Sequence, residues 1–527
     1  MTLASQKVAR TPELIGIIIK QVLAGTSNLA RNDELLSLMI VSRSFSSVSL
    51  DTLWENQTSL VPLFLTLRPV ARLFRLKDET RILRFEPGYK SPPWKRFHSY
   101  ARRVKVLDDS QDNGNLRCNI TLHPSLFQGL DPKSTILPML QTLRLHSRVV
   151  NSLHKAITLH VPTSTTDTRL LFVRRDLEGK DKKCKSITLG ALCDMRSLRC
   201  LGVQYVPQFA QWLETRGPLP NLHTFEAFRP NGIQRDYKSP TYPSAGNFSP
   251  SIVRLIQPSS VVDAARTLGS LPRTKKRNSV IALEITVPRG ADNIKRIGSY
   301  KQTIDLYREI HAYCDPSTLT HLCVFTGNAF SGLLFRASSL FADLLGFKNM
   351  EHLDIVFCCR HANLADAIDT FSFAFPRLKF LSLVIQRPER SNAEKYLALP
   401  TFDALLPLVR RCPLLEYVRL PLRVGWSWYS DKSLPKSVAV RPLTLNVMPS
   451  ASLFEPLEQS FVNSVASILR KLFPGLRRIE GFWSGRTDFQ SNQTDLPENF
   501  ARTKANWEEV EDIVANRMLR RLSRWNI

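Results

Sequence analysis

The sequence predicts an α/β repeat fold, in which parallel strands alternate with helices behind a separate N-terminal helical module. Three observations support this prediction. A nine-residue stretch recurs along the chain, helical patterns lie between several of its copies, and the first sixty residues follow a different pattern. The stretch is FPRLKFLSL at 375–383, and its frame is proline, any residue, leucine, two variable residues and an apolar residue. The other copies are LPMLQTLRL at 137–145, LPNLHTFEA at 219–227, CPLLEYVRL at 412–420 and FPGLRRIEG at 473–481.

Each copy of the frame predicts one short strand. Leu378 turns inward as the chain enters the strand, and Leu381 and Leu383 point to the same face because successive side chains alternate. Pro376 has no N–H to donate and therefore suits the start of a strand. Copies without the proline are centred on Leu201, Leu322 and Leu353, and weaker copies on Leu283 and Leu445. The pattern is that of leucine-rich repeats of about 20–29 residues, and the irregular spacing predicts an irregular leucine-rich-repeat solenoid with parallel strands backed by helices.

The intervals between the copies differ in character. Residues 330–347 place apolar side chains at helical spacing and end near Gly346, which predicts one long helix. A second helix is predicted within 396–412. Residues 146–193 and 229–278 contain no convincing strand motif. The second of these segments is rich in proline and serine, which favours a flexible insertion over a functional one.

The first sixty residues predict a compact bundle of helices. In the first helix, Leu14, Ile18 and Val22 lie along one face. Residues 32–45 predict a second helix and residues 46–67 a third segment. The side chains of the second helix that we expect to be buried are Leu35, Leu36, Met39 and Ile40. A module this small needs a partner or the following helices to complete its core.

This N-terminal segment resembles the F-box motif. Pro12-Glu13-Leu14, the apolar stripe after it, LLSLMIVSRSF at 35–45 and the region of Trp54 follow the order of that motif. The version is that of large fungal F-box-like families, which often carry leucine-rich repeats after the box. Two features depart from the pattern, because Thr11 stands where leucine is usual and the connection after the first helix is longer.

The resemblance implies a function. An F-box binds a Skp-type adaptor, which links it to a cullin and to ubiquitin transfer, so the chain would be a substrate-recognition subunit of a ubiquitin ligase. The implied adaptor-binding residues are Pro12, Leu14, Ile18, Leu36, Val41, Phe45 and Trp54. From the residues alone, the same side chains also suit the core of a helical bundle, and in so small a module some of them must serve as interface.

The repeat strands offer a candidate substrate surface. Residues on either side of the second apolar position of each frame are expected to face solvent. The candidate substrate-binding residues among them are Arg144, Glu226, His352, Asp354, Phe380, Tyr417, Arg419 and Arg478. Both signs of charge are mixed there with aromatic residues, whereas a surface that follows phosphates is enriched in Lys and Arg. The pattern therefore favours an unknown protein substrate and disfavours nucleic acid.

Composition narrows the remaining possibilities. The chain has 527 residues and a formal net charge of +26, which attracts polyanions without locating a binding face. Part of this charge lies at 180–185 and 272–277, where a solvated loop is favoured over a nuclear localisation signal. The nine cysteines include no CxxC pair. Cys358 and Cys359 are adjacent and would point to opposite faces of a strand, so we expect no metal site.

Signatures of enzymes and of membrane insertion were not found in the sequence. It contains no GxxxxGK[ST], HExxH or GxSxG motif and no GxGxxG after a strand, so we expect a non-catalytic adaptor without a cofactor. No stretch approaches the roughly 20 apolar residues of a membrane span. The apolar run at 14–19 is shorter than the core of about 7–15 residues in a secretory signal. We therefore expect a cytoplasmic or nuclear protein.

These inferences lead to one predicted domain organisation, and they leave one alternative function. The F-box-like helical module covers 8–65, a helical or irregular connection 66–135, and a leucine-rich-repeat-like domain 136–484, with the flexible insertion near 229–278. Residues 485–527 form a linker and a C-terminal helix that caps the last repeat. The alternative is a leucine-rich-repeat scaffold without a ligase link, associated with nucleic acid through its basic loops.

Overall fold

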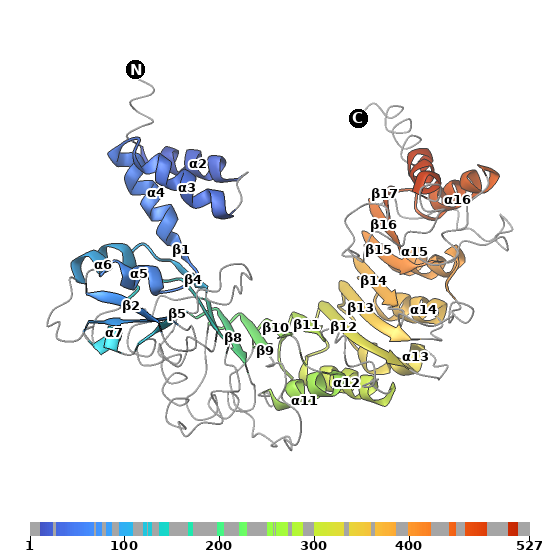
Figure 1. Cartoon of the computed structure of the whole chain (residues 1–527). Coiled ribbons are helices and arrows are strands. Elements are labelled where there is room, and N and C mark those ends of the chain that lie inside the picture. Colours follow the sequence, from blue (N-terminus) through green and yellow to red (C-terminus); the bar gives the residue numbers. More distant parts are fainter. Residues whose placement is uncertain are drawn as a thin grey trace. The chain divides into compact units, whose positions relative to one another are not determined.

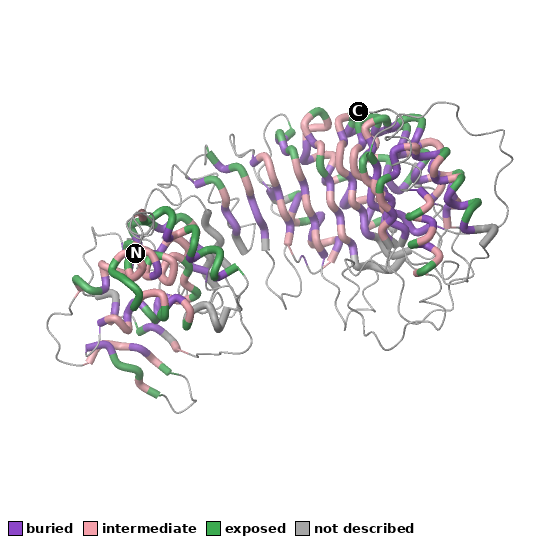
Figure 2. The backbone as a smooth tube through the Cα atoms, turned by 90° about the horizontal axis from the view of Figure 1, so that it is seen from above, coloured by how far each residue is buried: buried purple, intermediate pink, exposed green. Residues whose placement is uncertain are grey.

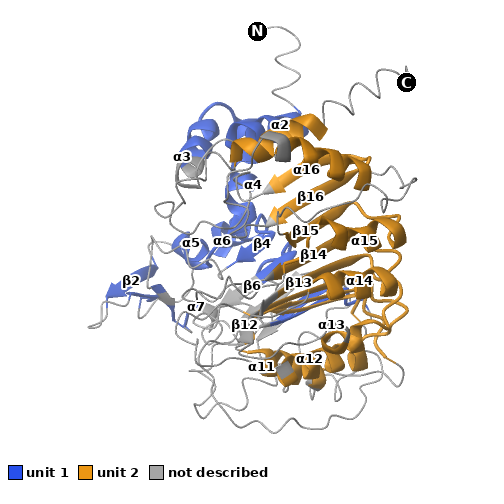
Figure 3. Cartoon of the chain, turned by 90° about the vertical axis from the view of Figure 1, so that its right-hand side faces the viewer, with its two compact units in different colours: residues 1–236 blue, residues 237–527 orange. Residues whose placement is uncertain are grey.

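The computed structural model divides the chain into two compact units, residues 1–236 and residues 237–527 (Figure 3). We refer to them as unit 1 and unit 2 and describe each by itself. The structure describes residues 11–24, 28–67, 70–75, 81–86, 94–108, 120–123, 125–128, 136–146, 167–171, 198–204, 221–228, 250–256, 258, 260–271, 277–287, 300–330, 337–359, 364–385, 399–422, 442–448, 459–481 and 504–514.

Unit 1 begins with helices and continues into parallel strands. Its described helices are α2 (Pro12–Leu23), α3 (Asn28–Met39), α4 (Arg43–Glu55), α5 (Val61–Leu65), α6 (Trp94–Ala101) and α7 (Ser125–Gln128). The strands of its main sheet are, in spatial order, β1 (Asn56–Gln57), β4 (Val106–Asp108), β6 (Thr142–His146), β7 (Asp167–Leu171), β8 (Cys200–Gln204) and β9 (Thr224–Phe228). Neighbouring strands in this series are parallel.

A small second sheet lies in the part of unit 1 predicted as a helical or irregular connection. It consists of β2 (Ala71–Arg75), β3 (Arg81–Phe85) and β5 (Ile120–Leu122). Strand β2 is antiparallel to β3, and β3 is parallel to β5. Leu83 at its centre is fully buried, and Phe85 contacts Trp94 of α6 edge to face.

Unit 2 alternates strands with helices along the chain. Its elements are β10 (Ile252–Ile256), α11 (Val261–Ser270), β11 (Ala282–Thr286), α12 (Tyr300–Tyr313), β12 (His321–Phe330), α13 (Ala337–Leu340), the 3-10 helix η2 (Ala342–Leu344), β13 (His352–Cys359), α14 (Leu364–Ala374), β14 (Phe380–Ile385), the 3-10 helix η4 (Phe402–Leu405), α15 (Leu406–Arg411), β15 (Tyr417–Pro421), β16 (Leu443–Met448), α16 (Gln459–Leu472) and β17 (Leu476–Gly481). The strands are parallel and pair in chain order. This confirms the predicted α/β class with parallel strands and helices, and the arrangement is compatible with a solenoid-like repeat.

The sheet of unit 2 has one face covered by helices. The helices run along one side of the strands (Figures 1 and 3), and along the strands buried residues alternate with less buried ones (Figure 2). The frame leucines are the buried set, as Leu378, Leu381 and Leu383 show with no exposed surface. The alternate residues of the same strands form the opposite face, which we call the helix-free face.

A repeated backbone contact sets the register of the strands. The N–H groups of Glu351 and His352 both donate to the carbonyl oxygen of Thr320, at 2.8 and 2.9 Å. One strand later, the N–H groups of Lys379 and Phe380 both donate to the carbonyl oxygen of Glu351, at 2.8 and 3.0 Å. The same pairing joins β14 to β15 in unit 2 and β4 to β6 in unit 1. Equivalent positions of successive repeats are therefore aligned side by side.

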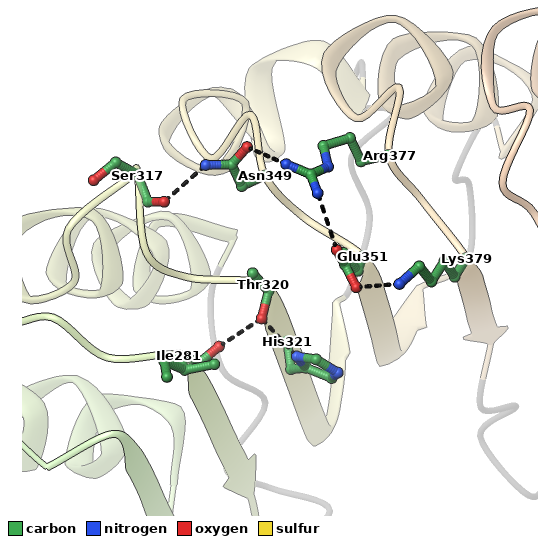
Figure 4. Close-up of polar contacts among 8 residues, drawn as sticks. All are labelled: Ile281, Ser317, Thr320, His321, Asn349, Glu351, Arg377 and Lys379. Carbon is green, nitrogen blue, oxygen red and sulfur yellow. Dashed lines mark hydrogen bonds and ion pairs between the residues drawn. The ribbon is translucent and has the colours of Figure 1, made fainter.

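Polar side chains reinforce this alignment at the start of the strands (Figure 4). Asn349 donates from Nδ2 to the carbonyl oxygen of Ser317 at 2.7 Å, and Arg377 donates to Oδ1 of Asn349 at 3.3 Å. Glu351 binds Lys379 at 2.6 Å and Arg377 at 3.6 Å. Asn349 and Arg377 occupy equivalent positions in successive repeats, and so do Glu351 and Lys379, so these repeats are connected outside the sheet as well as within it.

Two strands correct the prediction that 146–193 and 229–278 lack strands. Strand β7 pairs with β6 and β8, and β10 pairs with β11. Helix α11 follows β10, so the predicted flexible insertion is corrected for residues 250–271, while residues 229–249 lie outside the described part. The sequences DTRLL and IVRLI lack the proline and the leading leucine of the frame. They become strands because neighbouring strands supply hydrogen-bond partners for their backbone.

The long helix predicted at 330–347 is also wrong. Strand β12 continues to Phe330, and among the described residues 337–347 the helical segments are the short α13 and η2, while residues 331–336 lie outside the described part. The helical spacing of the apolar residues reflects their common burial, since Leu340 and Leu344 are both in the core. Gly346 does follow the last turn, and a Cβ there would lie 3.1 Å from the ring of His311. In the described part of the segment 396–412, residues 399–412, the helices are η4 and α15, and the C-terminal helix is described over 504–514.

The buried leucine frame leads to a stability prediction for unit 2. Replacing Leu381 by Ala should destabilise this unit by about 2–5 kcal/mol, because the side chain is fully buried in β14 and its removal leaves a cavity. Urea denaturation followed by circular dichroism measures this change. Phe373→Ala on α14 is the control, because its side chain is 75% exposed and should cost within about 0.5 kcal/mol. Equal effects of the two substitutions would contradict the assigned core.

Candidate functional site

The first candidate surface lies on the N-terminal helices of unit 1. Helices α2, α3 and α4 pack around a small core formed by Ile15, Ile19, Leu23 and Leu35. The partly buried side chains that pack against this core are Leu38, Phe45, Val48 and Leu53. Predicted burial of Leu35 is therefore confirmed, and the module has its own centre.

Helix α2 carries a second apolar stripe that this core does not use. Leu14, Ile18 and Val22 are exposed, and each precedes a core residue by one position. One position corresponds to a rotation of roughly 100° about the helix axis, so the two stripes are adjacent. Ile17 extends the exposed stripe further. The apolar surface of α2 thus covers much more than the stripe that one core requires.

The connection between α3 and α4 adds to this exposed apolar surface. Ile40 is 87% exposed and Val41 63% exposed. The sequence predicted one helix over 32–45 that buries Ile40 and Leu36, and this is corrected, since α3 ends at Met39 and Leu36 is exposed. Ser42 causes the break, because its side chain caps α4 by accepting a hydrogen bond from the N–H of Phe45 at 3.2 Å. We call Leu14, Ile17, Ile18, Val22, Leu36, Ile40 and Val41 the N-terminal apolar surface.

Two of the predicted adaptor-binding residues lie elsewhere in the module. Phe45 packs against the small core. Trp54 is partly buried near the end of α4 and stacks on Tyr100 of α6, with ring centroids 4.8 Å apart. The other five predicted residues are all exposed, namely Pro12, Leu14, Ile18, Leu36 and Val41. The sequence-based assignment left out Ile17, Val22 and Ile40. These residues can be recognised as part of the surface only once it is known which side of each helix packs against the core.

The end of α4 is fixed to the rest of unit 1 by charges as well. Lys105 binds Glu55 at 3.0 Å, and Arg103 pairs with Asp51. The N–H of Lys105 also donates to the carbonyl oxygen of Glu55 at 2.9 Å. Trp54 therefore belongs to a joint between α4 and the following elements, and its role there is structural.

The second candidate surface is the helix-free face of unit 2. Its first row consists of the residues that open each strand, and strand pairing aligns them across the sheet. In β12 to β15 these residues are His321, His352, Phe380 and Tyr417. Their rings stack in order, with centroid distances of 5.6, 4.0 and 4.5 Å and interplanar angles of 20°, 8° and 2°. We call them the ring ladder.

A second row lies two residues further along each strand. From β10 to β17 it consists of Arg254, Glu284, Cys323, Asp354, Ser382, Arg419, Asn446 and Glu480. Arg254 binds Glu284 at 3.0 Å. Asn446 donates to the hydroxyl of Tyr417 at 3.1 Å and to Glu480 at 3.4 Å. The ends of the row are thus internally paired.

The structure brings together most of the predicted substrate-binding residues. His352, Asp354, Phe380, Tyr417 and Arg419 lie on the neighbouring strands β13, β14 and β15. Arg478 is on β17 of the same unit, where its Nε lies 3.3 Å from Glu480. Arg144 and Glu226 belong to unit 1. Glu226 is only 1% exposed, and the side chain of Arg144 lies outside the described part.

Burial changes the acidity of three side chains on this face. Burial, with a smaller effect from His321, lowers the pKa of His352 to about 4, so this ring is neutral at pH 7. Burial raises the pKa of the Asp354 carboxyl, while Ser382 and Arg419 act in the opposite direction. Burial also raises the pKa of Tyr417, and the hydrogen bond from Asn446 opposes this rise. These shifts place the middle of the face in a partly dry environment.

Metal and membrane features can be judged only where the chain is described. Among those residues, no group of three or more His, Cys, Asp or Glu side chains is placed to hold a metal ion. No helix of the described ranges is long and apolar enough to cross a membrane.

The joint at Trp54 leads to a prediction. Trp54→Ala should speed hydrogen–deuterium exchange in residues 43–55 and 94–101 and destabilise the joint by about 1–3 kcal/mol, because the stack with Tyr100 is lost. Leu36→Ala is the control, because this side chain is exposed and should leave exchange in both segments unchanged. Unchanged exchange in the Trp54 variant would contradict the joint.

The lowered pKa of His352 predicts how stability depends on pH. The unfolded side chain takes up a proton near pH 6.5, whereas the folded one resists protonation until about pH 4. The unfolded state therefore binds more protons between these values, and the contribution of His352 to stability is lost as pH falls through this window.

His352→Phe should reduce that loss, because its ring stacks without titrating. Urea denaturation of unit 2 at several values between pH 7 and pH 4 measures the effect. The substitution His223→Gln in unit 1 serves as the control and should leave the pH dependence of unit 2 as it is. A parallel pH dependence in wild type and His352→Phe would refute the assignment.

Comparisons with known proteins add little evidence about the function of the chain. No protein-family model matches the sequence, and no curated protein matches it. Among solved structures, the chain is similar to a chain in the crystal structure of the yeast Rad7 and Elc1 complex, with 14% sequence identity and a TM-score of 0.33. The match covers 94% of this chain and 93% of that chain. A likeness at this TM-score carries no argument, so the function is argued from the residues of this chain.

Proposed function

We propose that the chain is the substrate-recognition subunit of a ubiquitin ligase of the Skp–cullin–F-box type. In this proposal the N-terminal apolar surface binds a Skp-type adaptor, which joins the chain to a cullin, and the helix-free face of unit 2 holds a protein substrate. The protein acts in the cytoplasm or nucleus and contributes no catalytic residue. It raises the local concentration of substrate at the ligase and fixes its orientation.

The observation that carries the proposal is the exposure of the N-terminal apolar surface. Seven large apolar side chains between Leu14 and Val41 are exposed although the module has a core of its own. Large apolar side chains that stay exposed beside an existing core are a feature of protein interfaces. Four of the seven residues, Leu14, Ile18, Leu36 and Val41, are those that the F-box resemblance assigns to adaptor binding, which is why we choose a Skp-type adaptor as the occupant.

The character of the helix-free face supports a protein substrate. Aromatic side chains of the ring ladder lie beside a row that mixes acidic, basic and neutral groups. Aromatic and arginine side chains are enriched at the energetic centres of protein interfaces. A surface for the phosphates of nucleic acid would present Lys and Arg without Asp354 and Glu284 in the same row.

Co-purification with a Skp-type adaptor tests the proposal. The double substitution Leu14→Asp and Ile18→Asp should weaken adaptor binding at least about tenfold, because it places two charges in an apolar interface. Both side chains are exposed in the free chain, so the fold should be retained, as circular dichroism can show. The control is Phe373→Asp, which adds a charge at an exposed apolar position of unit 2.

Each outcome of the co-purification test supports or contradicts a part of this proposal. Loss of binding in the double variant alone supports the assigned surface. Adaptor binding that is equal in wild type and double variant contradicts that surface. Failure of the wild-type chain to bind any Skp-type adaptor removes the ligase function and leaves the scaffold alternative.

A further inference from the structure

The middle of the helix-free face contains polar groups that lack partners. Asp354 Oδ1 and Arg419 Nε are buried atoms without a hydrogen-bond partner. They lie in the second row on β13 and β15, with the fully buried Ser382 between them on β14. A buried donor or acceptor left unpaired costs about 1–3 kcal/mol. Ser382 Oγ is unpaired as well, so one acceptor, one hydroxyl and one donor lie side by side in the second row.

The polar groups without hydrogen-bond partners are confined to the middle of the second row. Towards β10, Arg254 and Glu284 bind each other, and towards β17, Asn446 donates to both Tyr417 and Glu480. Packing is also complete on both sides of the unpaired groups. The ring ladder lies on one side, and on the other side Val356 and Val384 pack against the partly buried Phe325. The unpaired groups therefore lie between an aromatic row and an apolar row.

We propose that this surface binds an extended peptide segment that crosses β13, β14 and β15 above the second row, with a backbone N–H donating to Asp354 and a backbone C=O accepting from Arg419. This names the substrate class of the proposed function, and it rests on that function only for the peptide being part of a ligase substrate. An extended peptide is the ligand that presents donors and acceptors in alternation along one edge.

The spacing of the groups fits such a peptide. Neighbouring strands are about 4.8 Å apart, so the Cα atoms of Asp354 and Arg419, two strands apart, are separated by roughly 10 Å. In an extended chain two residues span about 7 Å, and the N–H and C=O of one residue point to the same side. The N–H of one residue and the C=O of the second residue after it are therefore separated by roughly 10 Å and point the same way.

The same geometry predicts how the side chains of the peptide are read. When backbone groups of alternate residues point down to the second row, the side chains point sideways and alternate between two directions. One set meets the edges of the Phe380 and Tyr417 rings, and the other meets the row of Val356 and Val384. The surface should prefer apolar or aromatic side chains at consecutive positions and show no preference for net charge. Phosphates are disfavoured because Asp354 lies at the centre.

The test uses the purified full chain and a phage library of random twelve-residue peptides, without any adaptor. A peptide enriched by the wild type is synthesised with a fluorescent label, and its Kd is measured by anisotropy. A series of peptides with one backbone nitrogen methylated at a time follows. Methylation removes the N–H donor, so binding should fall about tenfold or more at the position above Asp354 and remain at neighbouring positions.

Variants of the surface provide the second arm. Asp354→Asn preserves side-chain size, and Arg419→Gln shortens the side chain and removes the Nε donor; each should weaken binding of the selected peptide about tenfold or more. Glu284→Gln is the matched control, because it lies in the same row but outside β13 to β15, and should leave the Kd unchanged. Circular dichroism confirms the fold of each variant. A Phe380→Leu variant, which removes a ring from the ladder but stays apolar, should weaken peptides with an aromatic residue more than those without.

Several results would overturn the proposal. They are the absence of any peptide enriched above phage without insert, binding that is insensitive to every N-methylation, and equal Kd values in wild type, Asp354→Asn and Arg419→Gln. Preferential binding of a labelled thirty-nucleotide poly-dT by the wild type over every peptide would also refute it and favour nucleic acid. Because no adaptor is present, these results are independent of the co-purification test, and either proposal can fail alone.

Discussion

The structure depends on one backbone constraint that is repeated at the start of many of the described strands. Two successive N–H groups donate to a single carbonyl oxygen of the preceding strand, as Glu351 and His352 do to Thr320. This contact holds neighbouring strands in one register, so residues at equivalent positions line up across the sheet. The frame leucines then face the helices together, and the residues between them face the other side in straight rows.

The rows on the helix-free face follow from that alignment. Residues far apart in the chain become neighbours, and the rings of His352, Phe380 and Tyr417 stack because each opens its strand. Burial on this face lowers the pKa of His352, which keeps the ring neutral at pH 7, and raises the pKa of Asp354. Interactions of charges and hydrogen bonds are stronger in a row of polar groups beside the ring ladder, because little water is present to screen them.

The N-terminal module also uses apolar side chains, but it leaves some of them exposed. Helix α2 has apolar residues over more of its circumference than its small core can cover, so one stripe packs inward and the adjacent stripe remains exposed. Helix α4 divides its length between two tasks. Phe45 and Val48 pack against the core, whereas Glu55 and Trp54 fix the helix to α6 and the residues before β4. The exposed apolar side chains of α2 therefore lie on a module that α4 attaches to the rest of unit 1.

The sequence by itself determined the strands that carry the leucine frame and the helix from Pro12 to Leu23, because period-two alternation in a strand and apolar spacing in a helix are local features. Tertiary packing decided which of the predicted adaptor-binding residues are exposed, because the side of each helix that meets the core depends on the other helices. Tertiary structure alone decided that DTRLL and IVRLI are strands, that 330–347 is not one helix, and that Trp54 meets Tyr100. It also decided which charges of the second row find partners. These outcomes depend on contacts between residues far apart in the chain, and such contacts leave no periodic signal in either partner.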